Sequence, residues 1–209
     1  MIYLIGGPPK CGKTTLAKRL ANTHNIPWIS ADTLQNIVWA YTPNTKHSSL
    51  FPHSYLRRGS NDEFYSKNSS PNIVKNYVAQ GETTYDAISM MAETYLTDED
   101  DFIVEGYQVT PEIVDRIFKK YGQEHIRAAF LVKYDETKFI DDVHKSTTPN
   151  DWILRKTKNE ATFGLIAKMV VEYSRYFEME AKKTGMTVFN MDEDFEEQIE
   201  KIQKYFVSK

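Results

Sequence analysis

The stretch IYLIGGPPKCGKTTL, residues 2–16, decides the fold of this 209-residue chain. Its first four residues are a continuous apolar run of the kind found in buried parallel strands, and two glycines end the run. Residues 7–14 match the pattern G-x-x-x-x-G-K-[ST] in full. The apolar stripe that follows, with Leu16, Leu20 and Ala21, predicts a helix over 14–24. A strand, a glycine-rich turn and a helix therefore follow one another directly.

This order of elements is the one that a phosphate-binding loop requires. Glycines let the backbone bend so that successive N–H groups converge on phosphate oxygens, and the start of the helix adds unpaired donors. Lys13 is expected to reach the β- and γ-phosphates of a nucleotide, and the Thr14 hydroxyl to ligate Mg²⁺. A turn that merely ends a strand needs no Lys-Thr after its last glycine. The expected nucleotide-binding residues are Gly7, Pro8, Pro9, Lys10, Cys11, Gly12, Lys13, Thr14 and Thr15.

Composition and charge exclude several other classes of protein. Hydrophobic residues make up 41% of the chain and charged residues 26%, which predicts a sizeable core and argues against disorder. The net charge of -3 gives no general attraction to nucleic acid or anionic membranes. Cys11 is the only cysteine, so an intrachain disulfide and a cysteine-built zinc site are excluded. Without a signal peptide or an apolar run approaching ~20 residues, we expect a cytoplasmic protein that contacts neither nucleic acid nor membrane.

Short apolar runs alternate with helical patterns along the rest of the chain. They predict further strands at 26–30, 102–104, 128–132 and 187–191. This alternation predicts a three-layer α/β fold, with a five-stranded parallel sheet and helices on both faces. We treat residues 1–209 as a single domain in which two stretches interrupt the pattern. Residues 42–100 are interpreted as a substrate-side helical insertion between the second and third strands, and the polar, basic residues 144–160 as a mobile loop or lid.

Residues 1–24 resemble the opening of the small P-loop kinases of the adenylate kinase-like group. That group includes nucleotide, shikimate and gluconate kinases, chloramphenicol phosphotransferase and zeta-toxin-like kinases. The resemblance is specific at the phosphate loop and looser over the remaining layout. It implies a three-layer P-loop NTPase fold, ATP and Mg²⁺ as cofactors, a helical insertion on the substrate side, and a lid that carries arginine. The chain lacks the Asp-Gly-Phe-Pro-Arg type of sequence that adenylate kinases show after the third strand, which argues against a true nucleoside monophosphate kinase.

Two acidic residues follow predicted strands, at the edge where open α/β sheets bind ligands. Asp32 comes just after the second strand, where similar kinases place an acid that orients or deprotonates the acceptor hydroxyl or holds Mg²⁺ through water. Alternatively, Ser30 or Asp32 simply caps the next helix. Glu105 ends the third strand and resembles the Glu-Gly pair of phosphoglycerate kinase-like P-loop proteins. It is expected to serve Mg²⁺ through water or to bind the acceptor, and a structural ion pair is the alternative.

Three arginines are candidates for contacts with anionic groups. Arg155, in the expected lid, could neutralise charge on the transferred phosphoryl group, although the paired Arg-x-x-x-Arg pattern is absent and a solvated helix start is the alternative. Arg57 and Arg58 lie in the insertion, where a guanidinium group could bind an anionic acceptor through two parallel hydrogen bonds. Exposed surface arginines are the alternative there. The five histidines show no metal-ligand spacing and are interpreted as structural or surface groups.

These features predict ATP- and Mg²⁺-dependent phosphoryl transfer to a hydroxyl or phosphate of a small-molecule acceptor. Two other hypotheses stay open: a nucleotide-binding regulatory protein without efficient turnover, and a zeta-toxin-like kinase that acts on a sugar nucleotide. The absence of an Asn-Lys-x-Asp guanine signature argues against a GTPase. Backbone donors in the loop could lower the pKa of Cys11, or Cys11 could be only a small residue that fits a tight turn. The sequence does not identify the acceptor or the oligomeric state.

Overall fold

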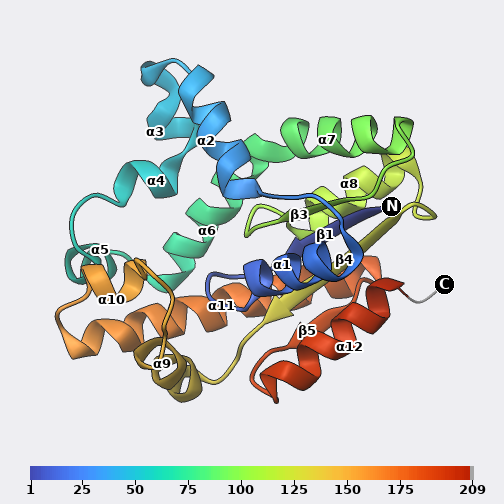
Figure 1. Cartoon of the computed structure of the whole chain (residues 1–209). Helices are drawn as coiled ribbons and strands as arrows, with labels where there is room; N and C mark the ends of the chain where they lie inside the picture. Colours follow the sequence, from blue (N-terminus) through green and yellow to red (C-terminus); the bar gives the residue numbers. More distant parts are fainter. Residues whose placement is uncertain (208–209) are drawn as a thin grey trace.

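Five parallel strands form one sheet at the centre of the computed structural model, which describes residues 1–207 (Figure 1). The strand order is β2-β3-β1-β4-β5, so the expected five-stranded parallel sheet is confirmed. The register pairs Glu105 with both Ile5 and Ser30, and therefore the loops that leave three neighbouring strands start at the same edge. The strands are β1 (Ile2–Gly6), β2 (Trp28–Ser30), β3 (Phe102–Glu105), β4 (Ile126–Val132) and β5 (Val188–Asn190).

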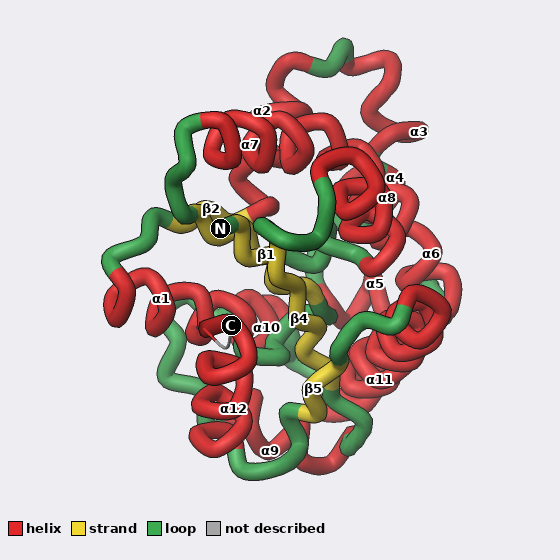
Figure 2. The backbone as a smooth tube through the Cα atoms, turned by 90° about the vertical axis from the view of Figure 1, so that its right-hand side faces the viewer, coloured by secondary structure: helices red, strands yellow, loops and turns green. Residues whose placement is uncertain are grey.

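Helices cover both faces of this sheet and complete the three layers (Figure 2). Helices α1 (Lys13–His24) and α12 (Phe195–Val207) pack on one face. The other face is covered by α7 (Tyr85–Thr97), α8 (Pro111–Tyr121) and the long α11 (Glu160–Thr184). Because β1 and β4 are covered from both sides, nearly every residue in them is buried. This explains why both strands are almost entirely apolar in sequence.

The insertion between β2 and β3 is helical along most of its length. It begins with α2 (Ala31–Tyr41) and continues through α3 (His47–Leu50), α4 (Pro52–Leu56), α5 (Asn61–Lys67) and α6 (Ser70–Gly81) to α7. The sequence predicted a helical insertion over 42–100 but not where its separate helices begin and end. Proline and serine, which usually mark loops, here begin helices. Pro52 opens α4, and the Ser60 side chain accepts a hydrogen bond from the backbone N–H of Glu63 at the start of α5.

The segment expected to be a lid lies between two helices and contains a third. Helix α9 (Glu136–His144) precedes it, α10 (Trp152–Lys156) lies within it, and α11 follows.

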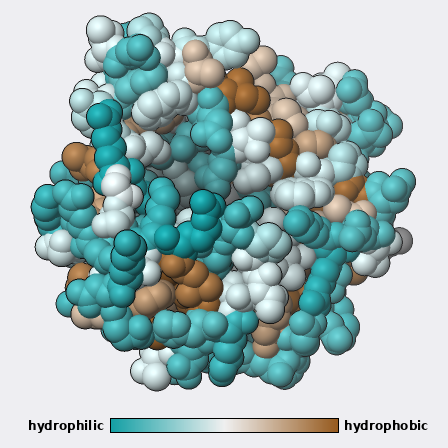
Figure 3. Space-filling model, turned by 60° about the vertical axis from the view of Figure 1, so that its left-hand side comes forward, coloured by the Kyte–Doolittle hydropathy of each residue, from teal (hydrophilic) through white to brown (hydrophobic). Residues whose placement is uncertain are grey.

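Hydrophilic side chains dominate the face shown in Figure 3, which is hollowed near its middle. Among the helices of residues 1–207, none combines the length and the apolar character that crossing a bilayer requires.

Candidate functional site

The loop between β1 and α1 is tightly curled, as the phosphate-loop pattern predicts. Gly7 and Gly12 have φ angles of 137° and 91°, in the range that glycine tolerates best. A Cβ atom on Gly7 would lie 2.1 Å from the carbonyl oxygen of Leu131, and one on Gly12 would lie 2.7 Å from a ring carbon of Phe195. Gly7 is therefore required by space as well as by backbone angle, because its neighbour is a backbone oxygen, whereas Gly12 is required mainly by its backbone angle.

The side chain of Lys13 folds back over this loop. Its ammonium group donates a hydrogen bond to the carbonyl oxygen of Pro8 at 2.6 Å, and the residue is buried. A cation is thus held beside the curled backbone, where the sequence places the β- and γ-phosphates. Lys10 also has a positive φ, 65°, which is uncommon for a residue with a side chain. Its ammonium forms an ion pair with Asp151.

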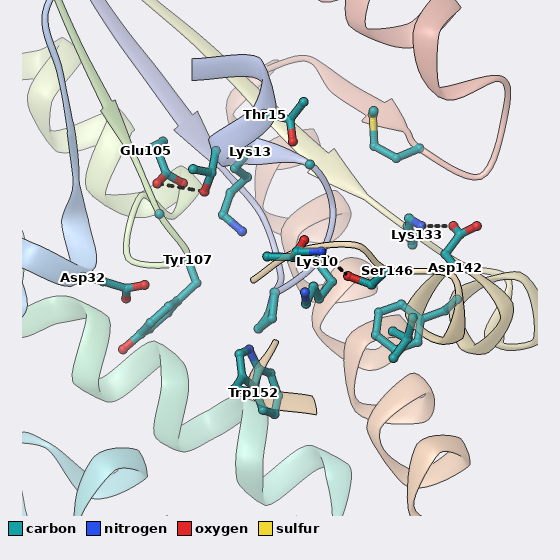
Figure 4. A pocket seen from close by; sticks show the side chains of 18 of the residues that line it. Lys10, Lys13, Thr15, Asp32, Glu105, Tyr107, Lys133, Asp142, Ser146 and Trp152 are labelled. Atoms are coloured by element: carbon teal, nitrogen blue, oxygen red, sulfur yellow. Dashed lines mark hydrogen bonds and ion pairs between the residues drawn. The ribbon is translucent and has the colours of Figure 1, made fainter. Parts of the chain in front are cut away.

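A buried carboxylate faces the first turn of α1. The Thr14 hydroxyl donates a hydrogen bond to Glu105 at 3.1 Å, and Glu105 is only 3% exposed (Figure 4). Burial raises the pKa of Glu105, while the charge of Lys13 and the hydrogen bond from Thr14 act in the opposite direction. A hydroxyl beside one or two carboxylates suits Mg²⁺, which keeps several waters and takes its other ligands from phosphates. Among residues 1–207, no group of three or more His, Cys, Asp or Glu side chains could hold a metal alone.

Asp32 lies across the cavity from Lys13, in the first turn of α2. The Ser30 hydroxyl accepts a hydrogen bond from the backbone N–H of Asp32 at 3.3 Å, so Ser30 is the residue that caps this helix. The Asp32 carboxylate is left to face the cavity and accepts a hydrogen bond from Gln108 at 2.8 Å. The positive end of the α2 dipole favours its negative charge.

A network of side chains, which the sequence did not reveal, continues from Asp32 into the insertion. Gln108 also donates to Gln35 at 3.1 Å, and the Tyr107 hydroxyl donates to the same oxygen of Gln35 at 2.5 Å. Gln80 then donates to the Tyr107 hydroxyl at 2.8 Å. Tyr107 and Gln108 follow Glu105-Gly106 at the edge of the sheet where ligands bind. Their position after the third strand is the sequence feature that could have identified them as site residues. Nothing in the sequence pattern distinguishes Gln35 or Gln80.

One cavity of about 1150 Å³ joins the phosphate loop to the insertion. Its volume exceeds the range of roughly 300–1,000 Å³ typical of a site for one small molecule, so it has room for a nucleotide together with an acceptor. The side chains expected at the phosphates, at the metal and at the acceptor share it. Nine of the residues predicted from the sequence line this cavity: Pro9, Lys10, Gly12, Lys13, Thr14, Thr15, Asp32, Arg57 and Glu105.

The two arginines of the insertion are separated by the structure. Arg57 lines the cavity, with its guanidinium carbon 3.8 Å from the centre of the Trp152 ring and a hydrogen bond to Asn61 at 3.4 Å. Arg58 is exposed, lies over the Tyr55 ring at 4.7 Å, and is not among the residues that line the cavity. Of the two neighbouring arginines, Arg57 is the one placed to meet a ligand.

Several buried polar atoms around Arg57 lack a hydrogen-bond partner within residues 1–207. They are both ring nitrogens of His53, the Nε of Arg57 and the hydroxyl of Tyr65. Burial, reinforced by the charge of Arg57, lowers the pKa of His53 to about 3, so the ring is neutral. Its ring stacks on Tyr77, with the two ring centres 3.7 Å apart. Unpaired buried polar groups are costly, which points to a polar ligand or water at this wall.

Two expectations fit the structure less well. Arg155 is exposed, donates to Asn150 at 3.4 Å and does not line the cavity, whereas Lys138 of α9 and Lys145 of the same 144–160 segment do. Cys11 is fully buried, and burial raises its pKa to about 11, which favours the second of the two alternatives given for this residue. Cys11 is a small residue that fits a tight loop.

Comparisons with known proteins show which solved structures share this fold. No protein-family model matches the chain, and no curated protein matches it in sequence. Among solved structures, a sugar kinase from Janibacter sp. is similar with a TM-score of 0.55 and 14% identity, over 98% of this chain and 93% of that one. A shikimate kinase from Bacteroides thetaiotaomicron has a TM-score of 0.52 and 15% identity, over 99% of this chain and 98% of that one. The chain has the fold of the P-loop small-molecule kinases.

A third similar structure is that of an uncharacterized protein from Eubacterium ventriosum. Its TM-score is 0.54 at 14% identity, and the match covers 100% of this chain and 99% of that one. All three matches therefore extend over nearly the whole length of both chains. At these identities the similarity establishes the architecture, while the chemistry has to be argued from the side chains of this cavity.

Proposed function

We propose that this chain transfers the γ-phosphoryl group of ATP, with Mg²⁺, to a hydroxyl or phosphate of a small polar acceptor. The observation that carries the proposal is the shared cavity, in which the phosphate loop with Lys13 and Thr14 faces Asp32 and the side of the cavity around Arg57. We call that side, which is lined by His53, Arg57, Tyr77 and Trp152, the Arg57 wall. Phosphoryl transfer requires mainly that the two reactants be held in line and that the charge on the transferred group be stabilised. A cavity that brings a phosphate cradle, an acid and an acceptor wall together meets both requirements.

On the nucleotide side, the backbone N–H groups of residues 7–14 bind phosphate oxygens and Lys13 stabilises their charge. The donor set of Thr14, Glu105 and Asp32 fits Mg²⁺, with the carboxylates acting through water. When bound there, Mg²⁺ would offset negative charge between the β- and γ-phosphates. The hydrogen bond from Thr14 at 3.1 Å holds the buried Glu105 carboxylate beside the first turn of α1.

On the acceptor side, Asp32 orients the acceptor hydroxyl and takes up its proton as the bond to phosphorus forms. Gln108 holds the Asp32 carboxylate through its 2.8 Å hydrogen bond, so the acid does not rotate away from the cavity. We assign an anionic group of the acceptor to Arg57 and not to Arg58, because only Arg57 lines the cavity.

Closure over the phosphates needs a cation from the segment 144–160. Arg155 is the sequence-based candidate for this role, but it would have to move from its position outside the cavity to act, so we favour Lys145. Lys145 already lines the cavity and, within residues 1–207, has no side-chain hydrogen bond or ion pair. The position of Arg155 outside the cavity is also the observation that favours the second hypothesis, a nucleotide-binding regulatory protein with little turnover.

The test is acceptor-dependent turnover in wild type and in Lys13→Ala. Wild type is incubated with ATP, Mg²⁺ and a panel of sugars, hydroxy acids and sugar nucleotides, and ADP release is measured. We expect one acceptor class to stimulate release, and Lys13→Ala to reduce it by at least about 10²-fold because a preorganised charge is lost. Lys119→Ala, which removes an exposed lysine on α8, serves as the control. Tight ATP binding without stimulation by any acceptor would favour the regulatory hypothesis, and stimulation by a sugar nucleotide the zeta-toxin-like one.

A further inference from the structure

The segment expected to be a lid is tied to the phosphate loop by one buried carboxylate. The Asp151 side chain is 3% exposed and forms an ion pair with Lys10 of the loop. It also accepts hydrogen bonds from the Ser146 hydroxyl at 2.8 Å and from the backbone N–H of Ile153 at 2.9 Å, which caps α10. Burial alone would raise the pKa of Asp151, but the hydrogen bonds from Lys10, Ser146 and Ile153 lower it, so the carboxylate is charged.

The loop residue in this ion pair has an unusual backbone. Lys10 adopts a φ of 65°, a conformation that glycine adopts without steric cost. Of residues 7–12 it is the only one other than glycine with a positive φ. A lysine at such a position supplies something that glycine lacks, and here its ammonium group reaches Asp151. Backbone strain at a ligand site is one of the observations from which a functional role can be argued.

The same segment is attached to the acceptor wall at its other end. The Trp152 ring lies under the Arg57 guanidinium at 3.8 Å, and Asn61 of α5 donates hydrogen bonds to Thr157 at 2.9 Å and to the carbonyl of Trp152 at 3.2 Å. Asp62 accepts hydrogen bonds from the backbone N–H groups of residues 158 and 159, at 2.9 and 3.2 Å. Residues 151–159 thus form a bridge from the phosphate loop to α5, the helix next to Arg57, and α10 lies beside α5 in Figure 1.

We propose that Asp151 is a positioning residue that fixes Lys10 of the phosphate loop and, through α10, couples the nucleotide side of the cavity to the Arg57 wall. The proposal rests on the proposed function in one respect: the ligand of the loop is a nucleotide. Binding at the loop then shifts Trp152 and Arg57, because the bridge is attached at both ends. Simple electrostatics predicts the opposite effect of removing Asp151, since the loss of a negative charge near bound phosphates would tighten nucleotide binding.

A double-mutant cycle tests this proposal. The variants are Lys10→Gly, which removes the ammonium and suits the positive φ, Asp151→Asn, which keeps a side chain able to cap α10, and the two together. Calorimetric titration with MgATP gives the dissociation constants. We expect each single variant to bind MgATP about tenfold more weakly than wild type. The double variant should bind MgATP no more weakly than either single variant, as for two residues that act through one contact.

Asp142→Asn is the matched control, because Asp142 also lines the cavity and pairs with a different lysine, Lys133. It should leave MgATP affinity equal or higher. Tighter binding by Asp151→Asn, or losses that multiply in the double variant, would overturn the proposal.

A second measurement separates this proposal from the proposed function. In a Trp28→Phe/Trp39→Phe background the fluorescence reports Trp152 alone. Asp151→Asn and Lys10→Gly should change its emission in the same direction without nucleotide, and the nucleotide-induced change should be lost in both. If wild type binds no MgATP, the proposed function fails while the emission comparison still decides whether the bridge exists. An unchanged emission in Asp151→Asn would refute the bridge.

Discussion

The two ends of the cavity are built in different ways. At the proposed phosphate end, residues 7–14 are contiguous, and their proposed role depends on backbone N–H groups in a loop that two glycines with positive φ shape. At the acceptor end, the wall is assembled from side chains of α2, α4, α6, the loop after β3, and α10, which are far apart in sequence. Backbone geometry of one segment is set locally, whereas the shape of a wall made of many segments is set by how they pack.

This difference has a consequence for substitution. If the proposed function holds, changes at the phosphate end should affect turnover with any acceptor, because the nucleotide would take part in every reaction of this cavity. Changes at the acceptor wall should alter KM for one acceptor class and leave nucleotide binding intact. The variants below test that division, beginning with the largest expected effect.

Glu105→Gln should reduce turnover by about 10²-fold and raise the Mg²⁺ concentration needed for half-maximal activity. The reason is that the amide keeps the size of the side chain but loses the buried negative charge that faces Thr14. The measurement is initial rate as a function of Mg²⁺ at saturating ATP. Glu82→Gln, at an exposed residue, is the control. An unchanged Mg²⁺ dependence would assign Glu105 the alternative role of a structural partner.

Arg57→Lys and Arg58→Lys form a matched pair of neighbouring substitutions. We expect Arg57→Lys to raise KM for the acceptor by about 10- to 100-fold with little change in KM for ATP, because a lysine cannot form the planar two-pronged contact. Arg58→Lys should have no effect, since Arg58 lies outside the cavity. Equal effects of the two variants would contradict the separation of the arginines by the structure.

The lid cation is tested by comparing Lys145→Ala with Arg155→Ala. We expect the larger loss of kcat, at least about tenfold, in Lys145→Ala because Lys145 already lines the cavity. Each of the two substitutions removes one positive charge, so a general electrostatic effect would be the same in both variants. A larger loss in Arg155→Ala would show instead that residues 144–160 move far enough to bring this arginine to the phosphates.

His53→Phe concerns stability and has the smallest effect on turnover with ATP. Burial lowers the pKa of His53 from 6.5 to about 3, so between these values the unfolded chain binds a proton that the folded chain does not. The free energy of unfolding therefore falls as pH drops from 6.5 toward 3, with a limiting slope of about 1.4 kcal/mol per pH unit. Phenylalanine should flatten this slope in urea unfolding at several pH values, whereas His24→Gln should not. The same slope in His53→Phe and wild type would place the acid sensitivity elsewhere.

Features set by contiguous residues were predicted from the sequence more accurately than features set by the packing of distant segments. All five strands were placed within about two residues, because continuous apolar runs mark strands that are covered on both faces. The separate helices in the first half of the insertion were not predicted, since this Pro- and Ser-containing stretch shows no continuous helical pattern, although Pro52 and Ser60 begin helices. Gln108 was missed because an isolated amide side chain carries no pattern until its partner, Asp32, is known.

The sequence by itself determined the sheet, the curled loop, and the ammonium and hydroxyl at the start of α1. These follow from neighbouring residues, whose apolar run, glycines and Lys-Thr pair act over a few ångströms of chain. Only the tertiary structure decided that Arg57 and not Arg58 faces the cavity, that Gln108 holds Asp32, and that Asp151 meets Lys10. Those contacts join residues up to 141 positions apart, and such pairs come together only when whole elements pack.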